Sequence, residues 1–315
     1  MRILVTGSRG VLGAPLVKRL RENGHEVLGC DLDHSGDENY RRCDIANWRE
    51  LRFMLDSMGG GWWPKYIINL AGEFGRKNSE VNWERVWTTN CIGTRNIIEL
   101  CKNYGAKLIH ASSSEAYGAE RLLEVTNQEG SGWFCGVEEV MCEESVTTRF
   151  FNEYSLTKWA NEKQIELSGV PAVSLRFFNV FGNEPFHPYR SVVCQFIYKM
   201  LRNEPVTVYQ NMSRDFLYIS DFIDSVALIP EVDFHALPPV INIGGVEGVS
   251  MEVLADMIKK LTGSSSDIFY LPAEENNVRI KKPDLTLARK YLNHDPKVSL
   301  RDGLAMTIEW MKEKL

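Results

Sequence analysis

The sequence predicts an α/β protein with a doubly wound parallel sheet and a smaller mixed lobe in its C-terminal half. Short apolar runs alternate with helical stretches through the first 180 residues of the 315-residue chain. This alternation is typical of a parallel sheet covered by helices on both faces. Beyond residue 180 the alternation loosens and prolines become frequent, which indicates a second, smaller unit.

The predicted elements follow one another from the N-terminus. Ile3–Val5 is a short strand, residues 11–20 carry apolar side chains at helical spacing, and Glu26–Cys30 is a second strand. The chain therefore begins with a β-α-β unit. Further strands are predicted at 66–70, 107–110, 172–177 and 240–243, and the longer helices at 86–104 and 154–167.

Two domains are expected from this pattern. The first takes residues 1–180 and a returning segment at about 216–245, in which a helix is predicted over 216–229. The second takes residues 181–215 and 246–315, with a strand at 206–209 and amphipathic helices at 250–262 and 301–314. The connection 118–153 is long, polar and acidic, and such a loop in a compact domain is usually functional or disordered.

Charge and composition exclude several classes of partner. The chain has 36 Lys+Arg against 42 Asp+Glu and a net charge of −6, which argues against nucleic acid or an anionic membrane. There is no run of 18 apolar residues and no leader-like N-terminus, so we expect a cytoplasmic protein that does not bind membranes. The seven cysteines lack C-x-x-C spacing, which predicts reduced thiols and no metal site.

The turn after the first strand has the pattern of a phosphate-binding site. Glycines stand at positions 7, 10 and 13, between a strand and a helix, as in Rossmann-type dinucleotide-binding folds. Asp31 ends the second strand, where a carboxylate can accept the adenosine ribose hydroxyls and repel a 2′-phosphate. NAD is therefore favoured over NADP, although Arg9 in the turn could contact a phosphate. The alternative is a tight turn without a ligand and a solvated Asp31.

A second pattern indicates acid–base chemistry. Tyr154 and Lys158 stand one helical turn apart, and a neighbouring ammonium and a nicotinamide cation both favour the phenolate of a tyrosine whose ordinary pKa is about 10. Ser113 follows the strand 107–110, at the edge of the sheet where doubly wound folds bind ligands. A serine there can hydrogen-bond both a substrate oxygen and the tyrosine.

Several motifs in one order identify the chain more closely. They are T-G-S-R-G-V-L-G (6–13), N-L-A-G (69–72), S-S-S-E-A-Y-G (112–118), Y-S-L-T-K (154–158), R-F-F-N-V-F-G (176–182) and R-D-F-L-Y (214–218). Together they resemble the extended short-chain dehydrogenase/reductases, and within these the NAD-dependent nucleotide-sugar epimerase/dehydratase family. The resemblance covers nearly the whole chain.

The resemblance implies a role for each matching position. The residues implied to bind NAD are Gly7, Gly10, Val11, Leu12 and Gly13 at the pyrophosphate, Asp31 at the adenosine ribose, Asp44 and Ile45 at the adenine, and Leu70, Ala71, Gly72, Asn90, Tyr154 and Lys158 at the nicotinamide end. The residues implied to contact a nucleotide-diphosphate sugar are Ser114, Asn179, Tyr189, Arg190, Arg214 and Arg279. A homodimer paired through helices 86–104 and 154–167 is also implied.

The implied reaction begins with transient oxidation of a sugar hydroxyl, commonly at C4, by Ser113, Tyr154 and Lys158. Dehydration, decarboxylation or epimerisation can follow. Glu115 resembles the glutamate that lies beside C5 in dehydratases and decarboxylases, and a carboxylate there is a sensible C5 base if burial raises its pKa. A purely structural ion pair is the alternative for Glu115.

Other readings of the chain remain open. They are a simple 4-epimerase, a net keto-sugar reductase, and a non-catalytic NAD-binding scaffold. Lys281 and Lys282 are expected to be partly solvated rather than catalytic, and Trp83 and Trp87 to pack within helices or the core.

Overall fold

The computed structural model describes residues 1–59, 61–118, 150–273 and 278–315, and the chain divides into two compact units. The first unit comprises Met1–Ala116, Asn152–Arg176 and Ile223–Ile241, and the second comprises Tyr117–Phe151, Phe177–Phe222 and Asn242–Leu315. The acidic connection 118–153 falls almost wholly on residues 119–149, so its predicted functional importance lies outside the described residues.

A seven-stranded sheet forms the centre of the first unit. Its order is β11-β6-β5-β4-β1-β2-β3, and the pairs from β3 to β5 are parallel. The strands are β1 (Arg2–Thr6), β2 (Glu26–Asp31), β3 (Tyr40–Arg42), β4 (Tyr66–Asn69), β5 (Lys107–Ser113), β6 (Ala172–Phe177) and β11 (Val240–Ile243). The chain winds outward in both directions from β1, so the predicted doubly wound fold is confirmed.

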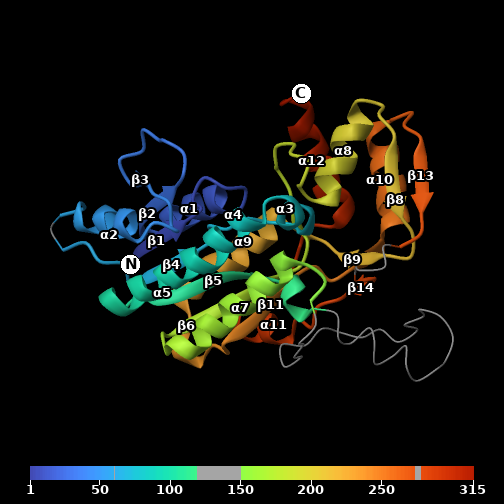
Figure 1. The fold of residues 1–315 in the computed structure, drawn as a ribbon. Coiled ribbons are helices and arrows are strands. Elements are labelled where there is room, and N and C mark those ends of the chain that lie inside the picture. The colour runs from blue at the N-terminus through green and yellow to red at the C-terminus, as the bar shows by residue number, and fades with distance from the viewer. Residues whose placement is uncertain (60, 119–149, 274–277) are drawn as a thin grey trace, which may run out of the picture. The chain divides into compact units, whose positions relative to one another are not determined.

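Helices cover both faces of this sheet. Its helices are α1 (Gly13–Glu22), α2 (Trp48–Asp56), α3 (Arg76–Val81), α4 (Trp83–Trp87), α5 (Gly93–Tyr104) and α7 (Glu153–Ser168). Leu4 and Ile67 of the strands share a core cluster with Leu51 of α2 and Ile97 of α5. Helix α1 packs on β1 and β2 without joining that cluster, so it covers the other face. Figure 1 shows α5 and α7 side by side.

The predicted helix 86–104 is interrupted. A π-helical segment, η1 (Thr88–Ile92), stands between α4 and α5. Within η1 the buried Asn90 donates and accepts hydrogen bonds outside its own helix. A π-helical turn inserts one residue into the regular ladder and is often found at functional sites, and the hydrophobic pattern of the sequence gave no sign of it.

The second unit combines small sheets with helices. Its elements are β7 (Val180–Phe181), α8 (Val192–Leu201), β8 (Val206–Tyr209), β9 (Ser213–Asp215), β10 (Leu217–Tyr218), β12 (Gly248–Ser250), α10 (Met251–Thr262), β13 (Ile268–Leu271), β14 (Ile280–Lys281), α11 (Thr286–Leu292) and α12 (Leu300–Lys312). Strand β9 lies between β12 and β14, β8 pairs with β13, and β7 pairs with β10. Buried side chains such as Ile197, Leu254 and Leu304 come from α8, α10 and α12, which pack on one another.

The predicted helix 216–229 is wrong at its start. Leu217 and Tyr218 form β10 and pair with Val180 and Phe181, so helix α9 spans only Ile219–Ala227. Two 3-10 turns, η3 (Ile229–Glu231) and η4 (Phe234–Ala236), then lead to β11. Among the described helices, none is long and apolar enough to cross a membrane.

Candidate active site

The glycine turn between β1 and α1 has a backbone that side chains would obstruct. Gly7 has a φ of +66°, and a Cβ there would lie 2.7 Å from the amide nitrogen of Ala71. A Cβ on Gly13 would lie 2.0 Å from the carbonyl oxygen of Gly7, so Gly13 is needed to close the turn itself. At the exposed Gly10, a Cβ would approach only the Gly7 carbonyl oxygen, at 3.2 Å. The turn is therefore open for a ligand at Gly10.

Helix α1 begins at Gly13, two residues later than predicted, so Val11 and Leu12 belong to the turn. Within the described part of the chain, no side chain caps the first turn of α1. The N–H of Ala14 already donates to the carbonyl of Gly10, and Pro15 has no N–H, so it is the positive end of the helix dipole that favours a phosphate here. The turn thus fits the pyrophosphate of a dinucleotide.

The carboxylate of Asp31 lies against this turn. Its Oδ2 accepts a hydrogen bond from the backbone N–H of Arg9 at 2.9 Å, and its Oδ1 accepts one from the N–H of Leu32 at 2.8 Å. The Asp31 carboxylate is therefore oriented by the backbone. Each carboxylate oxygen keeps a further lone pair, which can accept a ribose hydroxyl.

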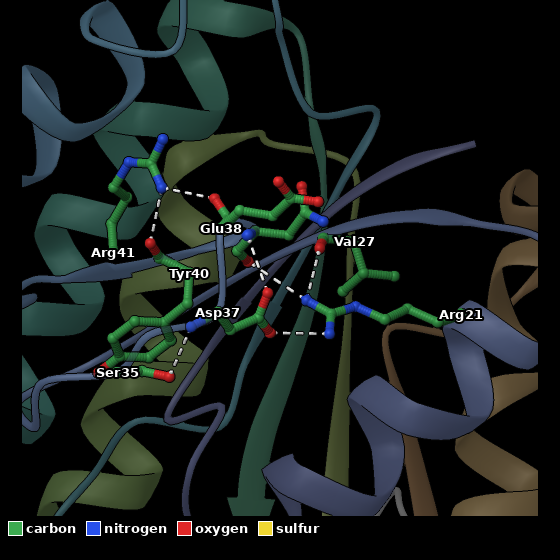
Figure 2. A network of polar contacts seen from close by, with 8 residues as sticks. Arg21, Val27, Ser35, Asp37, Glu38, Tyr40 and Arg41 are labelled. Carbon is green, nitrogen blue, oxygen red and sulfur yellow. Dashed lines mark hydrogen bonds and ion pairs between the residues drawn. The ribbon is translucent and has the colours of Figure 1, made fainter.

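The loop after Asp31 is tied to α1 by Arg21. The Arg21 guanidinium donates to the carboxylate of Asp37 at 2.8 Å and to the carbonyl of Val27 at 3.3 Å, as Figure 2 shows. The Arg21 hydrogen bond holds the pKa of Asp37 below its usual value. Arg9, Arg21, Asp37 and Tyr40 are among the residues around a hollow of about 390 Å³, so the surface between the glycine turn, α1 and this loop is recessed.

The residues predicted at the adenine lie in the turn before α2. The Oδ1 of Asp44 accepts the backbone N–H of Ala46 at 2.9 Å, and the side chain of Ile45 is 3% exposed. The side-chain amide of Asn96, on α5, donates to the carbonyl of Ile45 at 2.9 Å. This turn is therefore fixed to α5.

Asn90, Gly72 and Lys158 meet near the end of β4. The Oδ1 of Asn90 accepts the N–H of Glu73 at 2.8 Å, and its Nδ2 donates to the Oγ1 of Thr157 at 3.2 Å. A Cβ on Gly72 would lie 3.1 Å from the Oδ1 of Asn90 and 3.6 Å from the Nζ of Lys158. Asn90 thus connects the π-helix to the turn at 70–72 and to α7.

The three residues of the predicted triad also come together. Tyr154 and Lys158 lie on α7, and Ser113 ends β5. The Tyr154 phenol is hydrogen-bonded to the Ser113 side chain. The Nζ of Lys158 donates to the carbonyl of Ala111 at 2.8 Å and lies 5.7 Å from the centroid of the Tyr154 ring. The side-chain amide of Asn152 begins α7 by accepting the N–H of Ser155 at 2.9 Å.

The surroundings of Tyr154 shift its pKa away from the ordinary value. Shielding from water raises the pKa of Tyr154 to about 12, and the hydrogen bond with Ser113 only partly opposes this rise. Burial lowers the pKa of Lys158 to about 8. These side chains alone therefore do not prepare the phenolate at neutral pH, and further positive charge is needed beside Tyr154.

Glu115 lies beside the triad. It belongs to the 3-10 turn η2 (Ser114–Tyr117) that follows β5, and its backbone N–H donates to the Oγ of Ser113 at 3.2 Å. Its Oε2 accepts a hydrogen bond from the Oγ of Ser155 at 3.2 Å. The negative charge of Glu115 adds to the rise in the pKa of Tyr154, so the two groups act on each other electrostatically. Ser114, predicted to contact substrate, is 5% exposed.

A buried ion pair supports α7 one turn beyond Lys158. The Nε and Nη2 of Arg176 donate to the two carboxylate oxygens of Glu162 at 3.0 and 2.7 Å, and the Oγ of Ser112 donates to the same carboxylate at 2.5 Å. Both charged side chains are 7% exposed. The network joins α7, β5 and β6 directly below Ser113, and the sequence analysis missed the part played by Glu162.

The second unit contains a compact group of charged side chains on β9 and β14. The Nη1 of Arg214 donates to the carbonyls of Ser213 and Arg279 at 2.7 and 2.8 Å. Lys281 is paired in register with Arg214 across the parallel strands, so both side chains extend from the same face of this small sheet. They are 3% and 8% exposed.

The expectation that Lys281 is partly solvated is therefore wrong, because β14 buries it. The two consecutive lysines gave no sign in the sequence that Lys281 is buried. The alternation of buried and exposed side chains along a short strand was the signal that could have revealed it. On the next position of β9, Asp215 is 2% exposed. Burial raises the pKa of Asp215 to about 6, and Lys282 opposes that rise.

Except for Ser114, which lies in the first unit, the other predicted substrate residues also belong to the second unit. Asn179 has a φ of 39°, and its Nδ2 donates to the carbonyl of Asp215 at 3.1 Å. Tyr189 and Arg190 precede α8, and the N–H of Arg190 donates to the carbonyl of His187 at 2.9 Å. All predicted NAD-binding and catalytic residues lie in the first unit. Over the described residues, no group of His, Cys, Asp or Glu is arranged to hold a metal ion.

Comparisons with known proteins agree with this geometry. The model of the NAD dependent epimerase/dehydratase family matches residues 3–244. UDP-glucuronic acid decarboxylase 1 of Xenopus tropicalis is 30% identical over 100% of this chain and 73% of its own length. UDP-N-acetyl-alpha-D-glucosaminuronate decarboxylase of Bacillus cytotoxicus is 27% identical over 99% of this chain and 98% of its own.

A solved structure is similar over the full length. It is the UDP-glucuronic acid 4-epimerase of Bacillus cereus in complex with UDP-glucuronic acid and NAD, with a TM-score of 0.84, 25% identity and coverage of 100% of both chains. The family match extends from the first strand of the sheet to its last. The chain therefore belongs to the NAD-dependent epimerase/dehydratase family, as an NAD-dependent enzyme that modifies nucleotide sugars.

Proposed function

We propose that this chain oxidises a UDP-hexuronic acid at C4 and then decarboxylates it. The observation that carries this proposal is the carboxylate of Glu115, which is held beside the Ser113–Tyr154 pair by Ser155. Epimerisation at C4 needs proton and hydride exchange at C4 alone, whereas decarboxylation also needs a proton donor for C5. The similarity to two uronic acid decarboxylases supports the same choice.

The residues of the chain divide the work as follows. Tyr154 takes the proton of the C4 hydroxyl while Ser113 hydrogen-bonds the C4 oxygen. NAD held by the glycine turn and Asp31 would supply the hydride acceptor and donor for C4, and its nicotinamide cation would favour the phenolate of Tyr154. The 4-keto sugar loses its C6 carboxylate as carbon dioxide, and the bonding electrons remain as an enolate. Glu115, in its acid form, then protonates C5.

The nucleotide end is proposed to bind the second unit. Arg214 and Lys281 place two buried cations on one face of β9 and β14, which suits a diphosphate. The positions that match the family's substrate motifs add Asn179, Tyr189, Arg190 and Arg279. Such a local cationic surface lets a chain with a net charge of −6 bind a small polyanion.

The decisive experiment incubates the purified protein with NAD and UDP-glucuronic acid and follows the sugar by mass spectrometry. We expect a product that has lost carbon dioxide. Glu115→Gln should still form the 4-keto sugar but should block the later steps. Glu166→Gln, an exposed change on α7, is the matched control. Unchanged product formation by Glu115→Gln would remove the role proposed for Glu115.

A 4-epimerase acting on the same class of sugar is the second candidate. The similarity to the UDP-glucuronic acid 4-epimerase of Bacillus cereus favours it. In that case the product keeps its mass, and proton NMR shows inversion at C4. A net reductase would instead give a stoichiometric change in nicotinamide absorbance, and a scaffold would give no product and no dependence on Tyr154→Phe.

We further propose that the chain forms a homodimer. Exposed apolar side chains support this proposal, since Val81, Trp83 and Ile92 are 63%, 57% and 53% exposed on the segment from α3 to η1. The predicted core packing of Trp83 is therefore wrong. Light scattering should show a dimer that Trp83→Glu dissociates, while Phe53→Glu on α2 leaves it intact. A monomeric parent protein would refute the proposal.

A cytoplasmic location is proposed as well. Its support is the set of buried free thiols, which suits a reducing compartment. These are Cys30, Cys43, Cys91, Cys101 and Cys194. Cell fractionation tests this location.

A further inference from the structure

Ser155 lies between Glu115 and Asn152 at the start of α7. It follows Tyr154 on α7 and is 2% exposed. Its Oγ lies 3.2 Å from the Oε2 of Glu115 and 2.9 Å from the Oδ1 of Asn152. Both neighbouring atoms are hydrogen-bond acceptors when Glu115 is ionised.

A serine hydroxyl has one proton and cannot donate to both acceptors at once. The Oδ1 of Asn152 already accepts the N–H of Ser155 at 2.9 Å, so it loses little when the hydroxyl turns away. A carboxylate is the stronger acceptor. The hydroxyl therefore donates to Glu115 when Glu115 is ionised.

The opposite arrangement suits the acid form. A protonated Glu115 can donate its own O–H to the Oγ of Ser155, because the hydroxyl oxygen has lone pairs to accept it. The Ser155 hydroxyl then donates to the Oδ1 of Asn152. Both forms of Glu115 are fully hydrogen-bonded on this side without any movement of the backbone.

We infer that Ser155 is a positioning residue for Glu115 that supports both of its protonation states, with Asn152 as the alternative acceptor. The inference rests on the acid role proposed for Glu115. The printed distances tie Glu115 to the N-terminal turn of α7, the same turn that carries Tyr154. Tyr154, on the same helix, also interacts electrostatically with Glu115.

The proton balance of the C5 step follows directly. The O–H bond of Glu115 breaks, a C–H bond forms at C5 of the enolate, and the O–H electron pair remains on the carboxylate. The Ser155 hydroxyl rotates from Asn152 to Glu115 as this charge appears. Decarboxylation consumes one proton overall, and water restores it to Glu115 before the next turnover.

The test compares Ser155→Ala, which removes the hydroxyl, with Ser155→Thr, which keeps it. We expect Ser155→Ala to leave C4 oxidation within about twofold but to slow formation of the decarboxylated product by roughly tenfold or more. The rate of decarboxylation in Ser155→Ala should also stay high over a narrower range of pH. Ser155→Thr should restore both the rate and the width of this pH profile. Circular dichroism establishes that each variant folds.

A second measurement does not depend on turnover, so it still tests the inference if Ser155→Thr fails to fold. Infrared titration of the Glu115 carboxyl band, identified by its loss in Glu115→Gln, should show a shifted pKa in Ser155→Ala. Equal loss of both reaction steps, or no change in either readout, would overturn the inference. If Glu115→Gln itself leaves the product unchanged, the proposed function fails instead, and the two failures are thus distinguishable.

Discussion

Tyr154 and Lys158 illustrate how burial opposes the chemistry that the residues must perform. Removing both groups from water disfavours their charged forms, which raises the pKa of Tyr154 to about 12 and lowers that of Lys158 to about 8. The neighbouring Cys91 and Glu162 partly oppose the fall for Lys158. Burial, and to a smaller extent the charge of Lys158, lowers the pKa of His110 on β5. A positive charge placed beside Tyr154 would favour its phenolate and oppose the effect of burial.

The pH dependence of C4 oxidation should report the charge of Lys158. The ammonium loses its proton as the pH rises through about 8, and with it the support for the phenolate disappears. We expect the single-turnover oxidation rate to fall above this pH. Lys158→Arg, which keeps its charge, should move the alkaline fall upward. An identical fall in both proteins would assign it to another group.

Asp215 should make stability depend on pH. Its pKa of about 6 in the folded chain exceeds the ordinary value of 3.8, so the folded state holds the proton more tightly between these values. Stability therefore decreases as the pH rises through this window, by at most about 3 kcal/mol. Urea unfolding should find Asp215→Asn more stable than the parent at pH 8, with the difference vanishing near pH 4. A difference independent of pH would contradict this explanation.

At the level of elements, the network of Glu162, Arg176 and Ser112 fixes α7 against β5 and β6. Tyr154 and Lys158 lie on the same helix, so the position of α7 against β5 decides whether these two side chains reach Ser113. A buried ion pair adds little net stability compared with apolar side chains, but breaking it leaves an uncompensated charge. The main contribution of the Glu162–Arg176 pair is therefore to hold α7 in position.

A double-mutant cycle tests that view. Glu162→Gln or Arg176→Met alone should lower the free energy of unfolding by about 3–5 kcal/mol, because one charge remains buried without its partner. The double variant should lose much less than the sum of the two. Glu166→Gln breaks the exposed pair with Lys163 and should cost less than about 1 kcal/mol. Additive losses at Glu162 and Arg176 would show that they do not act as a pair.

At the level of the whole molecule, cofactor binding should couple to stability. A ligand at a hundred times its dissociation constant stabilises the folded state by about 2.7 kcal/mol. Removing NAD should therefore lower the melting temperature measured by calorimetry. Gly13→Ala should abolish this response, because its Cβ would lie 2.0 Å from the Gly7 carbonyl oxygen. Gly36→Ala, whose Cβ would meet no atom of the described residues within 4 Å apart from its chain neighbours, should respond as the parent does.

The main architecture could be predicted because its signals are local. The strand, glycine turn and helix at the N-terminus are consecutive, and Tyr154 and Lys158 are one helical turn apart, so spacing alone indicates their geometry. Lys281 could not be placed in this way, because its burial depends on β14 pairing with β9. Ser155 and Glu162 were missed for the same reason, since their partners lie 40 and 50 residues away.

The π-helical segment Thr88–Ile92 has a consequence for how this chain can change during evolution. Deleting one residue there would restore a regular α-helix between α4 and α5. It would also rotate one side of the helix by about 100° relative to the other, and the amide of Asn90 would lose its contacts with Glu73 and Thr157. A deletion that makes the backbone more regular would thus remove the support beside Gly72. Selection for activity should therefore preserve this costly insertion.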